Sequence, residues 1–528
     1  MKSVNTLLIN LTRFGDLVQS QAAIRDLALR GRRVAVVCLE NFSAAAGLLA
    51  HVDHLFPLPG AGLMAALESA RREPGQGWAR ALADLWAWKE NLLAVFSPDE
   101  VCNLTPSLPA RLLARFLAGP APCSGFAVDE YGFSLFGGEW AAFLQGAGAA
   151  RGISPFNVAD LFRRVAQSSA GPGDASLKRP DAALLERVGE DLRRAAPAEH
   201  KGFVALQLGA SEERRRWPAA SFAALGGRLW EEERLCPVLL GSAGEIPLAE
   251  EYLSQAGHPV LSLCGRTSLE ELAAALCSAR LLVTNDTGTM HLAAGLNRPL
   301  LAIFLATAQP FDTGPYCAGS CCLEPDCPCH PCSFGQDCSR DLVCRRALEP
   351  GLAADLALAF LRRGSWPQGP FSGPGRVWLS VLGADGFMDL RSLSGHEGGD
   401  RVLWLRLLRR SMSQFLDGGA VDLPERAALS APLGEALRQD LERVHALALL
   451  FLRQGEMLLS SAAPAFLKDR FLTTWQRTSR ALGQNPLLGA MDILWLEATQ
   501  SEGQELPQIL AVVKRFVQLL AELKKSIS

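Results

Sequence analysis

The stretch Leu7-Leu-Ile-Asn-Leu-Thr-Arg-Phe-Gly-Asp16 begins as a short apolar strand and turns at Gly15-Asp16. A helix is expected from about Leu17 to Arg30. The run Val34–Leu39 that follows is apolar and rich in β-branched residues, which is typical of a buried parallel strand. Strand, helix and strand in this order form a βαβ unit, so the chain opens as an α/β fold.

The same pattern continues along the chain. Residues 100–104 predict another strand and residues 107–117 another helix. A second series starts near Gly202, with strands expected at 203–208, 237–240, 281–284 and 300–304 and helices at 221–233 and 269–279. Two such series predict two doubly wound, Rossmann-like domains that face each other across a cleft. We assign residues 1–180 to the first domain and residues 200–365 to the second.

After Pro350 the composition and the apolar pattern of the sequence change, which indicates a third region. Residues 366–375 are rich in Pro and Gly, which indicates a linker. Residues 377–393 predict a hairpin. From about Arg401 to the end, apolar residues repeat at three- and four-residue steps and predict helices. We assign residues 376–528 to an appended, mainly α-helical domain.

The composition is that of an ordinary globular protein, with 49% hydrophobic and 20% charged residues. The 52 Lys and Arg nearly balance the 55 Asp and Glu, so no basic field attracts nucleic acid. No apolar run reaches the roughly 18 residues that span a bilayer, and the N-terminus lacks the pattern of a signal peptide. We therefore expect a cytoplasmic, reducing location, in which the 14 cysteines form no disulfide framework.

Two polar turns follow predicted strands, where α/β folds bind ligands. At Gly15-Asp16, the aspartate either caps the next helix or acts as general base on an acceptor hydroxyl. The turn Asn285-Asp-Thr-Gly-Thr-Met-His291 lies between a strand and a helix. Free N–H groups and the helix dipole bind phosphate at such a place. The alternative is a capped helix with a buried His291.

Two further turns carry residue types suited to a nucleotide. The stretch Leu208–Pro218 contains Arg214-Arg-Arg216, and arginine suits a diphosphate leaving group. The same run is also compatible with a solvated charged surface. Gly241-Ser-Ala-Gly-Glu245 places an acid after glycines, as in a ribose-binding turn, although short glycine-rich turns are common.

In order and spacing, these motifs resemble glycosyltransferase family 9, the ADP-heptose:lipopolysaccharide heptosyltransferases. The resemblance spans roughly residues 1–350 and rests on Leu8–Asp16, Val101–Ser107, Asn157–Phe162, Gly209–Ser211 with Arg215–Pro218, Gly241-Ser242 with Glu245, and Asn285–Ala294 with Arg298-Pro299. It implies a GT-B type fold, with the acceptor mainly on the first Rossmann-like domain and the nucleotide sugar mainly on the second. The resemblance does not extend to residues 376–528.

Carried over position by position, the resemblance implies that Asp16 is the general base, with Arg13 and Gly15 on the acceptor side. Arg215 stands where the family usually has Lys and would steady the diphosphate. The implied donor-binding residues are Ser211, Glu245, Asp286, Thr287, Gly288 and His291. Catalysis would be inverting and need no metal or cofactor. The donor would be a nucleotide-diphosphate sugar, and the acceptor a glycan, a lipid-linked sugar or a protein.

Two other functions stay open. A sugar-nucleotide epimerase has the same fold, but Gly15-Asp16 together with residues 286–288 favours the transferase. A catalytically silent scaffold working through the helical tail is the other alternative. It is favoured by Phe304-Leu-Ala-Thr307, which lacks the Gly-Pro that often precedes this Thr in the family. The presence of Asp16, Thr287 and His291 argues against it.

Eight of the cysteines fall between residues 317 and 344. The spacing of Cys329, Cys332, Cys338 and Cys344 predicts a four-thiolate site for a structural Zn or Fe ion. The loop also resembles one in protein-heptosylating members of the family, in which the cysteines bind iron. Free thiols in a reducing cell are the alternative.

Residues 401–410 form a basic amphipathic segment with Arg406, Arg409 and Arg410 on one face. Such a helix can contact an anionic membrane or a partner, which would place the protein peripherally on the inner membrane face. The alternative is that its apolar face packs inward.

Overall fold

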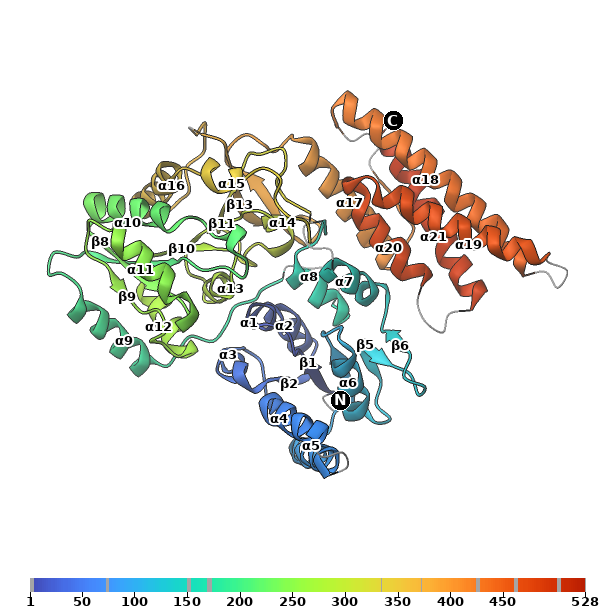
Figure 1. Ribbon diagram of the computed structural model, residues 1–528, viewed down its shortest axis with the longest axis horizontal. Helices are drawn as coiled ribbons and strands as arrows, with labels where there is room; N and C mark the ends of the chain where they lie inside the picture. Colours follow the sequence, from blue (N-terminus) through green and yellow to red (C-terminus); the bar gives the residue numbers. More distant parts are fainter. Residues whose placement is uncertain are drawn as a thin grey trace. The chain divides into compact units, whose positions relative to one another are not determined.

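The computed structural model describes residues 4–72, 76–149, 153–168, 173–333, 335–371, 373–423, 428–459, 464–500 and 505–527. The chain forms two compact units (Figure 1). Unit 1 comprises residues 1–126 and 157–394, and unit 2 comprises residues 127–156 and 395–528. Each unit is therefore built from two separate stretches of the chain.

The first sheet of unit 1 contains the parallel strands β3-β2-β1-β4-β5 in this order. They are β1 (Asn5–Ile9), β2 (Arg33–Leu39), β3 (His54–Leu58), β4 (Glu100–Asn103) and β5 (Cys123–Val128). The interiors of β1 and β2 are buried, which explains their unbroken apolar runs. The strand order reverses between β1 and β4, so their carboxyl ends form a topological switch point, where such sheets bind ligands.

The first half of unit 1 also contains α1 (Phe14–Gln19), α2 (Gln21–Leu29), the 3-10 turn η1 (Glu40–Phe42), α3 (Ser43–Gly47), α4 (Gly60–Arg72), α5 (Gln76–Val95) and α6 (Leu108–Ala118). The single helix expected over residues 17–30 is thus two helices. They are divided at Ser20, whose hydroxyl donates to the Leu17 carbonyl at 2.6 Å. A serine that bonds the backbone in this way competes with regular helix geometry.

The second sheet has the order β14-β13-β12-β11-β10-β7-β8-β9. Its parallel strands are β7 (Gly202–Gln207), β8 (Leu235–Leu240), β9 (Leu261–Ser262), β10 (Leu281–Asn285), β11 (Leu300–Ile303) and β12 (Cys321–Pro325). The order reverses between β7 and β10, which creates a second switch point at their carboxyl ends. The predicted fold class, two Rossmann-like α/β halves, is confirmed.

Helices of the second half are α8 (Val158–Val165), α9 (Ala182–Ala195), α10 (Ala219–Glu233), α11 (Ile246–Gln255), α12 (Leu269–Ser278), α13 (Gly288–Gly295), α14 (Pro310–Thr313), α15 (Val343–Ala347) and α16 (Pro350–Arg363), with the 3-10 turns η2 (Glu213–Arg215) and η3 (Ala243–Glu245). Buried side chains of the strands, α10 and α16 form one large core, which includes Leu206, Phe222, Leu301 and Leu356.

The hairpin of β13 (Gly375–Leu382) and β14 (Met388–Ser392) belongs to the second sheet. Its first strand pairs antiparallel with β12, with Cys322 opposite Trp378. The hairpin itself matches the sequence prediction, but the expected boundary at residue 376 differs from the observed division. The hairpin joins the second sheet because strand β12 would otherwise leave the N–H and C=O groups of its outer edge unpaired.

A buried polar cluster ties α8 to both halves of unit 1. The Arg163 guanidinium forms ion pairs with Asp26 of α2, at 2.7 Å, and with Asp160, at 3.2 Å. Asp160 also accepts hydrogen bonds from the Tyr316 hydroxyl at 2.6 Å and from the Met388 N–H at 2.8 Å. The Asp160 carboxylate therefore holds α8 against strand β14 and the loop of Tyr316 in the second half, and its partner Arg163 reaches the first half.

Unit 2 is mainly helical, as predicted. It contains β6 (Ser134–Phe136), α7 (Glu139–Ala149), α17 (Asp400–Leu416), α18 (Ala431–Leu458), α19 (Ala465–Gly483), the 3-10 turn η4 (Pro486–Leu488), α20 (Gly489–Thr499) and α21 (Leu506–Ser526). At Gly146 an added Cβ would lie 2.2 Å from a methyl of Ile493, so α7 packs closely on α20. Arg515 of α21 forms an ion pair with Glu139. Residues 127–156 thus belong with the tail, although the first domain was expected to run to residue 180.

The basic amphipathic segment lies in α17 and packs inward. The indole of Trp404 is buried and donates to the Leu487 carbonyl at 2.7 Å. Of the three arginines on the basic face, Arg409 is buried as well. Arg406 forms an ion pair with Glu397 at 2.6 Å. The apolar face of this helix is therefore occupied within unit 2.

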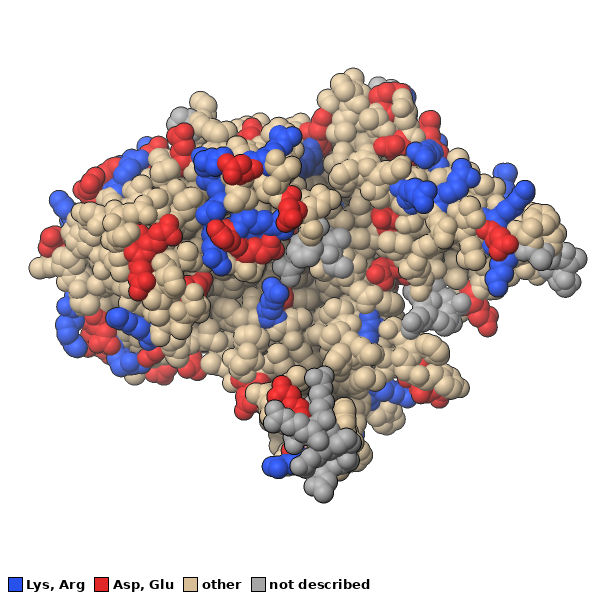
Figure 2. Space-filling view, viewed as in Figure 1, with Lys and Arg blue, Asp and Glu red and all other residues tan. Residues whose placement is uncertain are grey.

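The visible surface carries interspersed acidic and basic side chains, with no field of one sign (Figure 2). This agrees with the near balance of charges in the sequence. Among the helices that the structure describes, none combines the length and hydropathy needed to cross a membrane.

Candidate active site

The loop between β1 and α1 is held by the side chain of Asn10. The Asn10 carbonyl oxygen accepts the Thr12 N–H at 3.1 Å, and its amide donates to the Asp16 carbonyl at 3.2 Å. Arg13 precedes α1 in an extended conformation, and no side chain caps this helix. Asp16 lies in the first turn, and its carboxylate has no hydrogen-bond or ion-pair partner among the described residues. The alternative of a helix-capping Asp16 is therefore not what the structure shows.

The loop between β10 and α13 presents an uncapped helix start. Thr287 is the N-cap residue of α13, but its side chain makes no capping bond. The Asn285 amide donates to the Leu208 carbonyl at 2.7 Å, and its oxygen accepts the Trp217 N–H at 2.9 Å, which joins the ends of β10 and β7. His291 is buried one turn into α13. The first-turn N–H groups thus lie at the switch point of the second sheet, a favourable place for an anion.

The two helix starts approach each other closely. A Cβ added at Gly15 would lie 3.1 Å from Cδ2 of His291 and 3.4 Å from the Gly288 Cα. A Cβ added at Gly288 would lie 2.3 Å from a ring carbon of Phe14. Glycine is therefore required at position 288, because a larger residue would push the helices apart. The structure thereby brings together the predicted acceptor-side turn, Gly15-Asp16, and the predicted donor loop.

Arg215 occupies a buried position beside this loop. Its guanidinium forms an ion pair with Asp286 and donates to the Ser211 hydroxyl at 3.0 Å. The side chains of Arg215 and Asp286 are 7% and 6% exposed, so the alternative of a solvated charged surface does not hold for Arg215. The Arg215 Nε has no partner among the described residues. The guanidinium is thus neutralised, and N–H groups beyond these two bonds remain for a further acceptor.

Glu245 is held in a capping box at η3. One oxygen, Oε2, accepts the Ser242 N–H at 2.6 Å and the Ser242 hydroxyl at 2.9 Å. The other oxygen, Oε1, accepts the Gln207 amide at 3.1 Å. The carboxylate therefore has a fixed orientation at the carboxyl ends of β7 and β8.

Gln207 and Thr313 were not singled out from the sequence, whereas Asn285 opens the predicted turn Asn285–His291. Asn285 and Gln207 are buried polar residues at the ends of β10 and β7, and the Thr313 hydroxyl of α14 lies 3.5 Å from Asp286. The signal for Gln207 was available, since it is the polar residue in the otherwise apolar strand Phe203–Leu208. Thr313 carried no local signal, because α14 is a short turn brought to the site by β11.

The cysteine loop holds the four predicted metal ligands at different depths. Cys344 is buried in the core of the second half, whereas Cys338 is exposed. Within the described ranges, no three or more His, Cys, Asp or Glu side chains lie close enough together to hold a metal ion. The four predicted ligands nevertheless lie near one another, because burial and, after it, the neighbouring thiols of this set raise the pKa of Cys332 and of Cys344. The structural Zn or Fe site at Cys329, Cys332, Cys338 and Cys344 stays a prediction.

Cys338 is expected to be alkylated before the other thiols. It is exposed, and the N–H groups of Arg340 and Leu342, each 3.4 Å from its sulfur, lower its pKa and so raise the thiolate fraction. Burial raises the pKa of Cys321 and Cys322, which protects both. Brief iodoacetamide treatment at about pH 7.5 and peptide mass spectrometry measure this. Equal early labelling of Cys321 would contradict it, and Cys338→Ser should remove the fastest modification.

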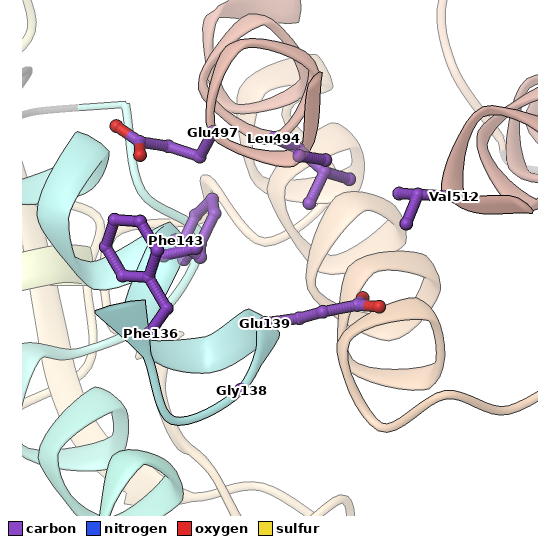
Figure 3. Close-up of a pocket in the computed structure, with 9 residues that line it drawn as sticks. Phe136, Gly138, Glu139, Phe143, Leu494, Glu497 and Val512 are labelled. Atoms are coloured by element: carbon purple, nitrogen blue, oxygen red, sulfur yellow. The ribbon is translucent and has the colours of Figure 1, made fainter. Parts of the chain in front are cut away.

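Unit 2 contains a separate cavity of about 190 Å³ (Figure 3). Phe136, Phe143, Leu494 and Val512 give it apolar walls. Glu139 also lines it, and burial raises the pKa of this carboxyl despite its ion pair with Arg515. None of the predicted site residues lines this cavity, so it is not part of the candidate active site.

Most of the candidate site lies in a segment that is similar to known proteins. Residues 158–342, which contain α8, the Arg215 segment and the α13 loop, match the model of glycosyltransferase family 9 (heptosyltransferase). Lipooligosaccharide heptosyltransferase 2 of Haemophilus influenzae is 33% identical over 101 residues, which are 18% of this chain and 29% of that protein. Lipopolysaccharide heptosyltransferase 1 of Pseudomonas aeruginosa is 33% identical over 156 residues, which are 29% of this chain and 43% of that protein.

The matched stretches thus span less than half the length of these curated relatives. Among solved structures, the ADP-heptose lipopolysaccharide heptosyltransferase II of Escherichia coli aligns with 68% of this chain and 99% of its own, at 18% identity and a TM-score of 0.49. The family model covers the donor loop and the Arg215 segment described above. Over residues 158–342 the chain is therefore similar to glycosyltransferase family 9, the heptosyltransferase family.

Proposed function

We propose that this chain is an inverting glycosyltransferase that moves a heptose or a related sugar from a nucleotide-diphosphate donor, ADP-linked, to a lipopolysaccharide-core or other glycan, lipid-linked or protein acceptor. The observation that carries the proposal is the approach of the two helix starts. The partnerless Asp16 carboxylate lies in the turn directly after Gly15, and position 15 is within van der Waals distance of Gly288 and His291.

The proposed mechanism uses groups of the chain alone. Asp16 accepts the proton of the acceptor hydroxyl, whose oxygen attacks the anomeric carbon of the donor sugar from the face opposite the diphosphate. The bond from the anomeric carbon to the diphosphate breaks, and the electron pair leaves with the nucleotide diphosphate. The first-turn N–H groups of α13 and the guanidinium of Arg215 stabilise the charge that develops on it. No cofactor takes part in this scheme.

Donor binding in this proposal draws on the residues that surround the α13 loop. Thr287 and Gly288 present the hydroxyl and the backbone at the helix start, with His291 beneath them. Asp286 and Ser211 hold Arg215 in place and would contact the sugar and the diphosphate themselves. We further propose a cytoplasmic location, peripheral on the inner membrane face, which is where such donors and lipid-linked acceptors meet.

Nucleotide binding tests the proposal before an acceptor is known. We expect ADP to bind the wild-type chain with micromolar affinity in calorimetry and Thr287→Ala to bind it about tenfold more weakly, because a hydroxyl bond to a charged phosphate is lost. Thr499→Ala, which changes the same residue type in unit 2, is the control and should bind ADP as the wild type does. Absence of binding by ADP and by every other nucleoside diphosphate would contradict the proposed function.

A further inference from the structure

A chain of hydrogen bonds crosses the candidate donor site from α13 to η3. The Thr289 hydroxyl donates to the Gln207 side-chain oxygen at 3.1 Å. The Gln207 amide then donates to Oε1 of Glu245 at 3.1 Å, and Glu245 accepts both donors of Ser242 through Oε2. Gln207 and Thr289 are buried, with 3% and 7% of their surfaces exposed. Gln207 therefore links the helix start proposed for the diphosphate to the carboxylate proposed for the ribose.

The donors and acceptors in this series of hydrogen bonds allow a single orientation of the Gln207 side-chain amide. An ionised carboxylate only accepts hydrogen bonds, so the group facing Glu245 must be the amide nitrogen of Gln207. Its oxygen consequently faces Thr289, whose hydroxyl must donate. A carboxylate oxygen accepts about two hydrogen bonds. Oε2 of Glu245 is occupied by the two donors of Ser242, whereas Oε1 receives one donor and keeps one acceptor position.

Close packing against glycine keeps the carboxylate in this orientation. A Cβ at Gly209 would lie 1.3 Å from Oε1 of Glu245, and a Cβ at Gly241 would lie 3.1 Å from Oε2. The carboxylate therefore lies directly against the backbone that follows β7 and β8. Glycine at position 209 is needed because any side chain there would displace Glu245.

We propose that Gln207 is a positioning residue, which presents the free acceptor position of Glu245 Oε1 to a ribose hydroxyl of the nucleotide. By holding Thr289 at its other end, Gln207 couples this contact to the first turn of α13. The inference rests on the proposed nucleotide-binding function, and it adds how the site distinguishes a ribonucleotide from a deoxyribonucleotide. Gln207 itself does not touch the nucleotide.

The test is the discrimination between ADP and its 2′-deoxy and 3′-deoxy forms, measured by calorimetry. Wild type should bind ADP about tenfold more tightly than at least one deoxy form, as expected for loss of one hydrogen bond to a carboxylate. In Gln207→Leu this ratio should fall to about one, because Glu245 loses its fixed orientation. Gly209→Ala should have the same effect by direct displacement of the carboxylate.

Gln21→Leu is the matched control. Gln21 is an equally buried glutamine on α2 that bonds the backbone of Ala50, so its loss disturbs packing without touching Glu245. The control should keep the wild-type ratio even where overall affinity falls. If Gln207→Leu does not fold, Thr289→Val removes the hydrogen bond from the Thr289 hydroxyl to Gln207 with a smaller structural change. It should lower the ratio less than Gly209→Ala, and together with Gly209→Ala it should have no further effect.

The outcomes distinguish a positioning role of Gln207 from a purely structural role. A wild type that discriminates, with variants at Gln207 and Gly209 that do not, supports the inference. Variants that weaken ADP and its deoxy forms equally, so that the ratio is kept, would overturn it and leave Gln207 a structural residue. A wild type that binds ADP without discrimination would overturn it as well. A wild type that binds no nucleotide would contradict the proposed function, and this inference with it.

Discussion

Asp16→Asn is expected to lower kcat for glycosyl transfer by about 10²–10⁴-fold, the usual contribution of a general base, and to leave the ADP dissociation constant within about twofold. The substitution keeps the size of the side chain and removes its ability to take a proton. The Asp16 carboxylate makes no hydrogen bond or ion pair within the described ranges, so its loss should cost little stability. Binding is spared because the α13 loop and Arg215 stay intact.

The measurement is release of ADP from ADP-heptose in the presence of a lipopolysaccharide-core acceptor. Asp84→Asn, an exposed aspartate of α5 in the same half, is the control and should keep wild-type activity. A variant at Asp16 that transfers at the wild-type rate would remove this residue from the mechanism. A wild type that binds ADP but transfers to no acceptor would favour the silent-scaffold alternative.

Arg163→Met is expected to lower the free energy of unfolding of unit 1 by about 3–5 kcal/mol, as breaking a buried ion pair does. The Arg163 side chain is 5% exposed and the Asp160 side chain 1% exposed. Burial already holds the pKa of the Asp160 carboxyl above its usual range, despite the hydrogen bonds from Tyr316 and Met388. Without the guanidinium this carboxylate has no cation, and Asp26 loses its partner at 2.7 Å.

Urea unfolding followed by circular dichroism measures this loss. Arg187→Met, which removes the exposed pair with Glu271 at 2.8 Å, is the matched control and should cost less than about 1 kcal/mol. Asp160→Asn in the Arg163→Met background should recover part of the stability, because the unpaired charge is gone. An effect of Arg163→Met no larger than that of the control would show that the cluster contributes little to the fold.

Local patterns in the sequence were enough for the α/β class and for two of the site segments. The run Val34–Leu39 is apolar at every position. Only a strand that is covered on both faces buries such a run. The segment Asn285–His291 was placed correctly between a strand and a helix. Since the carboxyl ends of parallel strands share one edge of a sheet, this placement alone put it at a ligand-binding edge.

The partners of the site residues were beyond such patterns. Arg215 and Asp286 are 71 positions apart in the chain, and Gln207 and Glu245 are 38 positions apart. Periodicity reports which face of its own helix or strand a residue occupies, and it carries no information on contacts over such distances. The same limit applies to the cysteines, whose spacing did not show that Cys344 packs into the core while Cys338 is exposed.

By itself, the sequence determined the strands, the helices and the turns that end them, because these depend on backbone sterics and on apolar periods within a few residues. Only the tertiary structure decided that the hairpin of β13 and β14 completes the second sheet, that residues 127–156 pack with the appended helices, and that Gly15 meets Gly288. Those choices depend on which open strand edge, apolar face or gap is within reach once the chain has folded, and that is a property of the whole chain rather than of any segment.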